Sequence, residues 1–128
     1  MTNRLLHFTL IALAAPMVAK ADVGTARQLT AIDRAFESAQ KTKNLEAYHA
    51  ARARLEALVE RLGSPSSDST VPPYLRPCYA AAVRLETSRS QAWLMARTRP
   101  SQAEQRIATA NREEYLAALD SCRADQPM

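Results

Sequence analysis

Two cysteines, Cys78 and Cys122, place the strongest constraint on what this chain can fold into. Between them lie two stretches with helical periodicity, separated by Arg97-Thr98-Arg99-Pro100-Ser101, whose middle is halfway between the cysteines. Two antiparallel helices rising about 1.5 Å per residue would bring both cysteines level at the open end of a hairpin. We therefore predict a Cys78–Cys122 disulfide, the alternative being two buried free thiols. In the chain-entropy model such a crosslink stabilises a fold by roughly 4 kcal/mol.

The connection itself carries helix-boundary signals. Pro100 lacks an amide hydrogen and biases Arg99 away from helical dihedral angles. Ser101 and Glu104 have the spacing of a capping box. These signals predict helices over about 78–98 and 102–123.

Residues equidistant from Pro100 should face each other across the hairpin, which places Arg89 opposite Asn111 in an otherwise apolar seam. Arg89 could extend outward with its stem on the core. Alternatively, Arg89 and Asn111 could form a buried pair with a binding role.

The first half of the chain shows the same helical pattern. Apolar residues recur at three- and four-residue spacing over about 25–40 and 45–62, Asn44 suits the N-cap between these segments, and Gly63 suits the end of the second. No alternating strand pattern is present. We predict an all-α, four-helix up-down bundle made of two antiparallel hairpins, the second clasped by the disulfide.

The segment 63–77 is rich in proline and serine and cannot sustain a helix. Its second half, Val71 to Leu75, includes Tyr74 and is apolar enough to dock on the bundle or on a partner. The segment is either a plain connector with a docked end or a binding loop.

The third predicted helix has apolar residues around much of its circumference. Val83 and Leu94 lie on the side opposite Cys78, with Trp93 nearby. This helix is either the most buried of the four or has an outer side that forms a contact surface. At the closed end of the hairpin, Arg97, Arg99 and Arg106 could meet an acidic partner or lipid headgroups, or they could form a solvated turn.

The residues offer little support for catalysis. His49 is the only histidine beyond residue 21, and its Glu46-x-x-His49 spacing lacks the second such pair that a di-iron bundle requires. Two cysteines far apart in sequence do not form a standard structural zinc site. No glycine-rich phosphate loop or nucleophile elbow occurs. We expect no enzymatic activity, no catalytic residue, no metal and no cofactor.

Residues 1–21 have the plan of a cleavable secretory signal peptide: Arg4, an apolar run, then Ala19-Lys20-Ala21 as the cleavage signal. The alternative is an uncleaved membrane anchor. The remaining residues, 22–128, suffice for a single helical domain. Cleavage removes two basic residues and no acid, which halves the net charge of +4. So weak a surplus does not indicate nucleic acid as a partner.

Together these features predict a periplasmic or secreted, non-enzymatic module that binds another envelope or extracellular protein as an inhibitor or accessory. The alternative is a small-molecule carrier with a pocket between the hairpins near Trp93 and Tyr115. We expect no stable membrane anchor after cleavage.

The signal-peptide interpretation predicts a defined mature N-terminus. When the chain is expressed with its native leader, the exported protein should begin at Asp22, because Ala19 and Ala21 present small side chains to the signal peptidase. Intact-mass measurement of exported protein tests this directly. Full-length protein retained in the membrane fraction would support the anchor instead.

Overall fold

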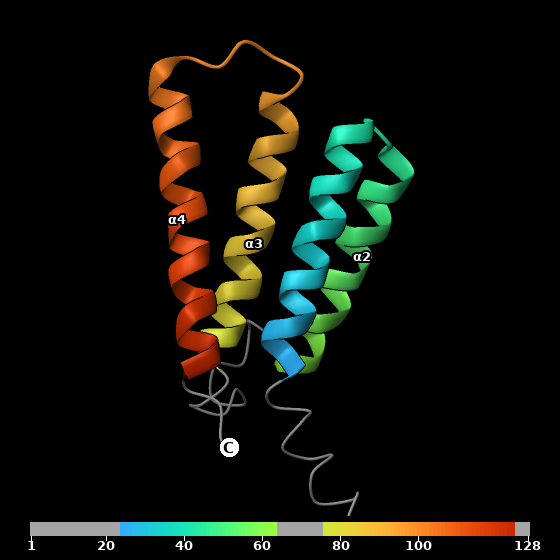
Figure 1. Ribbon diagram of the computed structural model, residues 1–128, viewed down its shortest axis with the longest axis vertical. Coiled ribbons are helices and arrows are strands. Elements are labelled where there is room, and N and C mark those ends of the chain that lie inside the picture. The colour runs from blue at the N-terminus through green and yellow to red at the C-terminus, as the bar shows by residue number, and fades with distance from the viewer. Residues whose placement is uncertain (1–23, 64–75, 125–128) are drawn as a thin grey trace, which may run out of the picture.

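The fold is an all-α bundle of two antiparallel helical hairpins, as the sequence predicts. The computed structural model describes residues 24–63 and 76–124, and within them it contains four helices and no strand. Figure 1 shows the closed ends of both hairpins at one end of the bundle. The predicted signal peptide and nearly all of the predicted loop 63–77, Tyr74 included, lie outside the described residues.

The first hairpin consists of a helix at residues 24–42 and α2, Leu45–Leu62. Asn44 caps α2, since its side-chain oxygen accepts a hydrogen bond of 3.0 Å from the Ala47 amide. The turn is closed by two backbone hydrogen bonds, Lys43 N–H to Gln40 O at 3.2 Å and Asn44 N–H to Ala39 O at 2.9 Å. This is the Schellman pattern of a helix C-terminus.

Lys43 occupies the left-handed position of that turn, with φ at 54°. Glycine is the usual residue there, because a side chain in the left-handed region costs about 1 kcal/mol. Local backbone energetics therefore do not explain why a lysine stands at this position.

The second hairpin consists of α3, Arg76–Met95, and α4, Gln102–Ala124. The predicted capping box is present: the Glu104 amide donates to Ser101 Oγ at 3.1 Å, and the Ser101 amide donates to Glu104 Oε1 at 2.9 Å. α3 ends at Met95, before the expected residue 98, so the connection to α4 is longer than the sequence suggests. In Figure 1 the two helices lie apart at this connection.

The predicted disulfide joins Cys78 and Cys122 at the open end of the hairpin, where their Cα atoms are 4.5 Å apart. The tightly packed part of the hairpin lies in this half. Its fully buried residues are Cys78, Ala81, Ala82, Leu85, Tyr115 and Cys122. Small alanines allow α3 and α4 to approach closely here. Toward the connection the seam opens, and Ile107 of α4 is 54% exposed.

An aromatic column connects the two hairpins through their cores. Phe36, from the helix at 24–42, meets Tyr48 of α2 edge-on with ring centroids 5.3 Å apart. Tyr48 in turn stacks on Trp93 of α3, with their ring centroids 4.4 Å apart. Such pairs contribute about 1 kcal/mol each beyond the area they bury. The column therefore holds α3 against both helices of the first hairpin.

None of the helices in the described ranges combines the length and the apolar character needed to cross a bilayer.

The separation of the two bonded cysteines along the sequence predicts a large effect of the disulfide on stability. Breaking the Cys78–Cys122 bond should lower the free energy of unfolding by about 4 kcal/mol, because the cysteines are 44 residues apart and the bond restricts the unfolded chain. Urea denaturation of the native protein, the reduced protein and the Cys78→Ala/Cys122→Ala variant measures this loss. The reduced protein leaves no cavity at either residue, so it isolates the crosslink. Equal stability before and after reduction would contradict the prediction.

Candidate functional site

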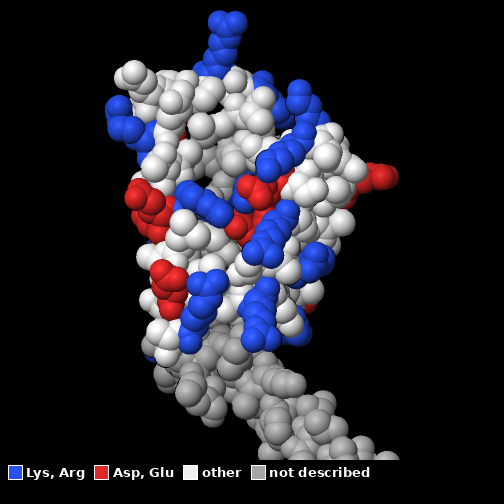
Figure 2. All heavy atoms as spheres, viewed as in Figure 1, with Lys and Arg blue, Asp and Glu red and all other residues white. Residues whose placement is uncertain are grey.

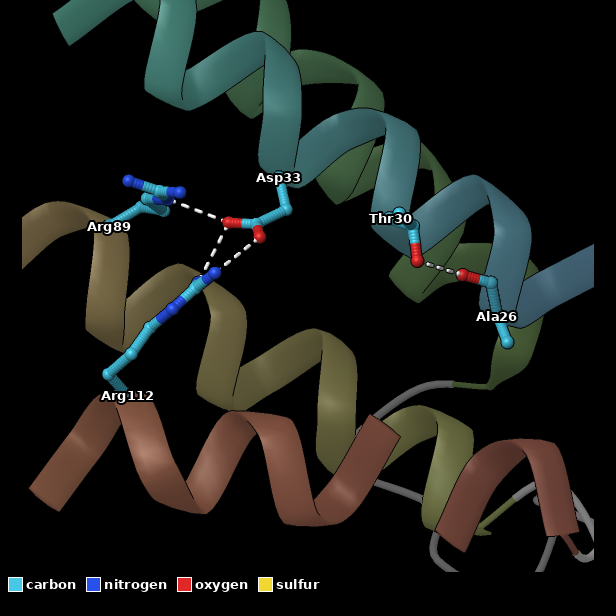
Figure 3. Close-up of polar contacts among 5 residues, drawn as sticks. All are labelled: Ala26, Thr30, Asp33, Arg89 and Arg112. Carbon is cyan, nitrogen blue, oxygen red and sulfur yellow. Dashed lines mark hydrogen bonds and ion pairs between the residues drawn. The ribbon is translucent and has the colours of Figure 1, made fainter. Parts of the chain in front are cut away.

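The most heavily charged part of the interior is centred on Asp33, in the middle of the helix at residues 24–42. Its carboxylate accepts hydrogen bonds from two arginines of the other hairpin (Figure 3). Arg89 Nε of α3 lies 2.7 Å from Oδ1. Arg112 of α4 donates from both terminal nitrogens, at 2.9 Å to Oδ1 and 2.7 Å to Oδ2. Three helices thus meet at one carboxylate.

Burial and ion pairing act on this carboxylate in opposite directions. The side chain of Asp33 is 12% exposed, and that of Arg89 is 13% exposed. Burial alone would raise the pKa of Asp33, but hydrogen bonds from Arg112 and Arg89, with the charges of both, lower it below the ordinary 3.8. Conversely, the hydrogen bond to Asp33 raises the pKa of Arg112 despite its partial burial. The Asp33 carboxylate is therefore ionised at neutral pH.

Both expectations for Arg89 were incomplete, because neither included Asp33. The Arg89 side chain neither extends into solvent nor pairs with Asn111, whose amide donates instead to Gln91 Oε1 at 2.6 Å. The missed signal was available in the sequence. Asp33 lies four residues after Leu29 and three before Phe36, on the same apolar helix face. A charged residue at a core position requires a partner.

Tyr115 is sealed inside the second hairpin, so its side chain does not face a solvent-accessible pocket. The residue has no exposed surface, and its hydroxyl makes no hydrogen bond within the described residues. The Arg112 guanidinium lies 5.1 Å from the ring centroid. Burial, reinforced by the nearby Asp33 charge, raises the pKa of Tyr115 to about 12. Tyr115 is therefore a neutral core residue.

The arginines named in the sequence analysis come together at the closed end of the second hairpin. Arg97, Arg99 and Arg106 are exposed, and within the described chain their guanidinium groups have no hydrogen-bond or ion-pair partner. Figure 2 shows Lys and Arg side chains around this end of the molecule, with uncharged surface between them. The carboxylate of Glu104, in the same region, is engaged by Ser101.

Exposed apolar residues accompany these charges. Leu94 is 63% exposed and Ile107 is 54% exposed, so the hairpin end combines positive charge with apolar surface. Val83, further along α3, is 43% exposed. Of the two expectations for the outer side of α3, the structure therefore supports an exposed face rather than complete burial.

A groove of about 350 Å³ lies between the closed ends of the two hairpins. One wall comes from the first hairpin and the other from the end of α3. Its lining residues are Gln40, Lys43, Leu45, Trp93, Ala96 and Arg97. Trp93 contributes its indole to this groove while stacking on Tyr48. The groove is mostly apolar, with one cationic side chain from each wall.

Residues considered for acid-base or metal chemistry do not converge. His49 is exposed, with its ring 6.0 Å from that of Tyr48. Glu114 pairs with Arg84 on the surface. Within residues 24–63 and 76–124, no three His, Cys, Asp or Glu side chains are grouped closely enough to hold a metal ion. A thiolate nucleophile is excluded while Cys78 and Cys122 remain bonded.

Comparisons with protein-family models, curated proteins and solved structures found no match to this chain.

The Asp33 cluster predicts a strongly destabilising substitution. Asp33→Asn should lower the free energy of unfolding at pH 7 by about 2–4 kcal/mol, because it leaves the largely buried Arg89 guanidinium and the partly exposed Arg112 guanidinium without a counter-charge. Urea denaturation measures this difference. Glu60→Gln, which removes an exposed carboxylate on α2, is the matched control and should change stability by no more than about 0.5 kcal/mol.

The effect of pH on this difference follows from the lowered pKa of Asp33. Its stabilising contribution is complete above the ordinary value of 3.8 and is lost as pH falls through the lower folded-state value. The native protein and Asp33→Asn should therefore converge in stability as pH falls below about 4. A difference that stays constant between neutral and strongly acidic pH would contradict the ion-pair interpretation.

Proposed function

We propose that this protein is an exported, non-enzymatic binding module that contacts another envelope or extracellular protein through the closed end of its second hairpin. The observation that carries the proposal is the juxtaposition of exposed Leu94 and Ile107 with three arginines that have no ion-pair partner in residues 24–63 and 76–124. Arginine is enriched at protein interfaces, and exposed apolar residues supply the desolvated contact that gives an interface its affinity.

The location of these residues also favours contact. In Figure 1 the closed end of the α3–α4 hairpin projects beyond the end of the first hairpin. The disulfide lies at the opposite, open end of the hairpin. The tightly packed half around the disulfide therefore anchors the half that projects. A partner of matching chemistry would present carboxylates around an apolar patch.

Export is supported by two features. A cleavable leader is the interpretation of residues 1–21, and disulfides persist in oxidising compartments such as the periplasm or the extracellular space. The non-enzymatic part of the proposal is supported by the engagement of both cysteines in the disulfide and by the isolated position of His49.

A second candidate function, a small-molecule carrier, is favoured by one observation. The groove between the hairpins has Trp93 in its wall and a volume of about 350 Å³, within the range of small-ligand sites. Trp93 lines this groove and Tyr115 does not.

Site-specific photo-crosslinking tests the protein-binding function. A photoreactive amino acid at Leu94, and separately at Ile107, should crosslink the same exported protein in living cells. The same amino acid at Ala57, exposed on α2, should not. Different products at Leu94 and Ile107, or equal crosslinking from Ala57, would contradict a defined interface at the hairpin end.

The contribution of charge is then measured with the purified crosslinked partner. Arg99→Gln/Arg106→Gln should weaken binding about threefold to tenfold and reduce its dependence on salt, because exposed charges at an interface contribute modestly and are screened. Arg52→Gln/Arg54→Gln removes two exposed arginines from α2 and should leave binding unchanged. Equal losses in the two double variants would show that overall charge, and not this end of the hairpin, governs binding.

A further inference from the structure

We propose that the groove between the closed ends of the hairpins binds a small amphipathic carboxylate, such as a free medium-chain fatty acid, with its apolar chain against Trp93 and its carboxylate between Lys43 and Arg97. This inference rests on the carrier function named above as the second candidate. It adds the chemical class of the ligand.

The lining of the groove indicates a ligand with an apolar body. Apolar surface in the groove comes from Trp93, Leu45 and Ala96. Leu45, the first residue of α2, is 52% exposed and therefore accessible to a ligand. One side of the Trp93 indole is supported by its 4.4 Å stack on Tyr48. The aromatic wall is therefore held in place before a ligand arrives, which reduces the entropic cost of binding.

The charges indicate an anionic head group. Lys43 and Arg97 reach the groove from opposite walls, and within the described residues no acid forms an ion pair with either side chain. Glu46, the one acidic residue in the first turn of α2, does not line the groove. A carboxylate can therefore accept hydrogen bonds from both sides, while a cationic ligand would be repelled.

The backbone at Lys43 is an independent observation. With φ at 54°, this residue stands where glycine would be conformationally preferred. The lysine side chain therefore contributes a cation to the groove at a position that local folding would assign to glycine. The same backbone geometry allows the charge to be tested separately from folding, because Lys43→Gly removes the charge and should not destabilise the turn.

The experiment uses Trp93, the single tryptophan of the chain, as its reporter. Octanoate is titrated below its micelle-forming concentration, and changes in Trp93 emission are compared with heats from isothermal calorimetry. Octanol supplies the apolar body without the charge, acetate the charge without the body, and octyltrimethylammonium the opposite charge. We expect octanoate to bind at least tenfold more tightly than each of the other three.

Variants separate the head-group contacts from folding. Lys43→Gly/Arg97→Gln should melt at or above the native temperature and bind octanoate at least tenfold more weakly, while its weak affinity for octanol stays the same. Arg52→Gln, on the exposed surface of α2, should bind octanoate as the native protein does.

Other outcomes would contradict either the carboxylate recognition or the carrier function. Equal binding of octanoate and octanol, or equal losses in Arg52→Gln and the double variant, would refute carboxylate recognition and leave an apolar carrier site. Binding of none of the four probes, by fluorescence or by heat, would refute the carrier function as well. The protein-binding function would then still be decided by the crosslinking experiment.

Discussion

The covalent bond between Cys78 and Cys122 sets the level of α3 against α4, and the packing of the second hairpin depends on it. With the open ends held at a Cα separation of 4.5 Å, Ala81, Ala82 and Leu85 of α3 are buried in the same core cluster as Tyr115 of α4. The restraint weakens with distance along the helices. Near the 96–101 connection the helices lie apart, and exposed apolar and cationic residues gather there. One half of this hairpin is thus tightly packed, and the other half exposes apolar and cationic side chains.

The two hairpins are held against each other by ion pairs and aromatic packing and not by a disulfide bond. The Asp33 carboxylate draws Arg89 and Arg112 inward, and the column of Phe36, Tyr48 and Trp93 packs apolar rings across the same boundary. A buried ion cluster is weak evidence for net stability, because desolvation opposes the attraction between the charges. It is strongly directional, however, and fixes how the hairpins are rotated against each other. The groove and the Trp93 wall are consequences of that docking.

The separate parts of the fold could be predicted because each follows from local sequence signals. The Ser101–Glu104 box, the Asn44 cap and the equal spacing of the cysteines about Pro100 specify helix ends and register within a hairpin. Arg89 could not be placed correctly by the same reasoning. Its partner Asp33 is 56 residues away, and no periodicity relates positions in different hairpins. The end of α3 was missed because Pro100 marks only the latest point at which that helix could stop.

The sequence by itself determined four amphipathic helices and their pairing into two hairpins, since short-range geometry dictates both, and it favoured a disulfide over two free thiols. Only the tertiary structure decided which face of each hairpin meets the other. That choice places Asp33 among arginines, seals Tyr115, and brings Lys43 and Arg97 to opposite walls of one groove. The reason is physical: helix periodicity fixes which residues share a face, whereas the contact between faces is settled by the burial and charge of the whole bundle.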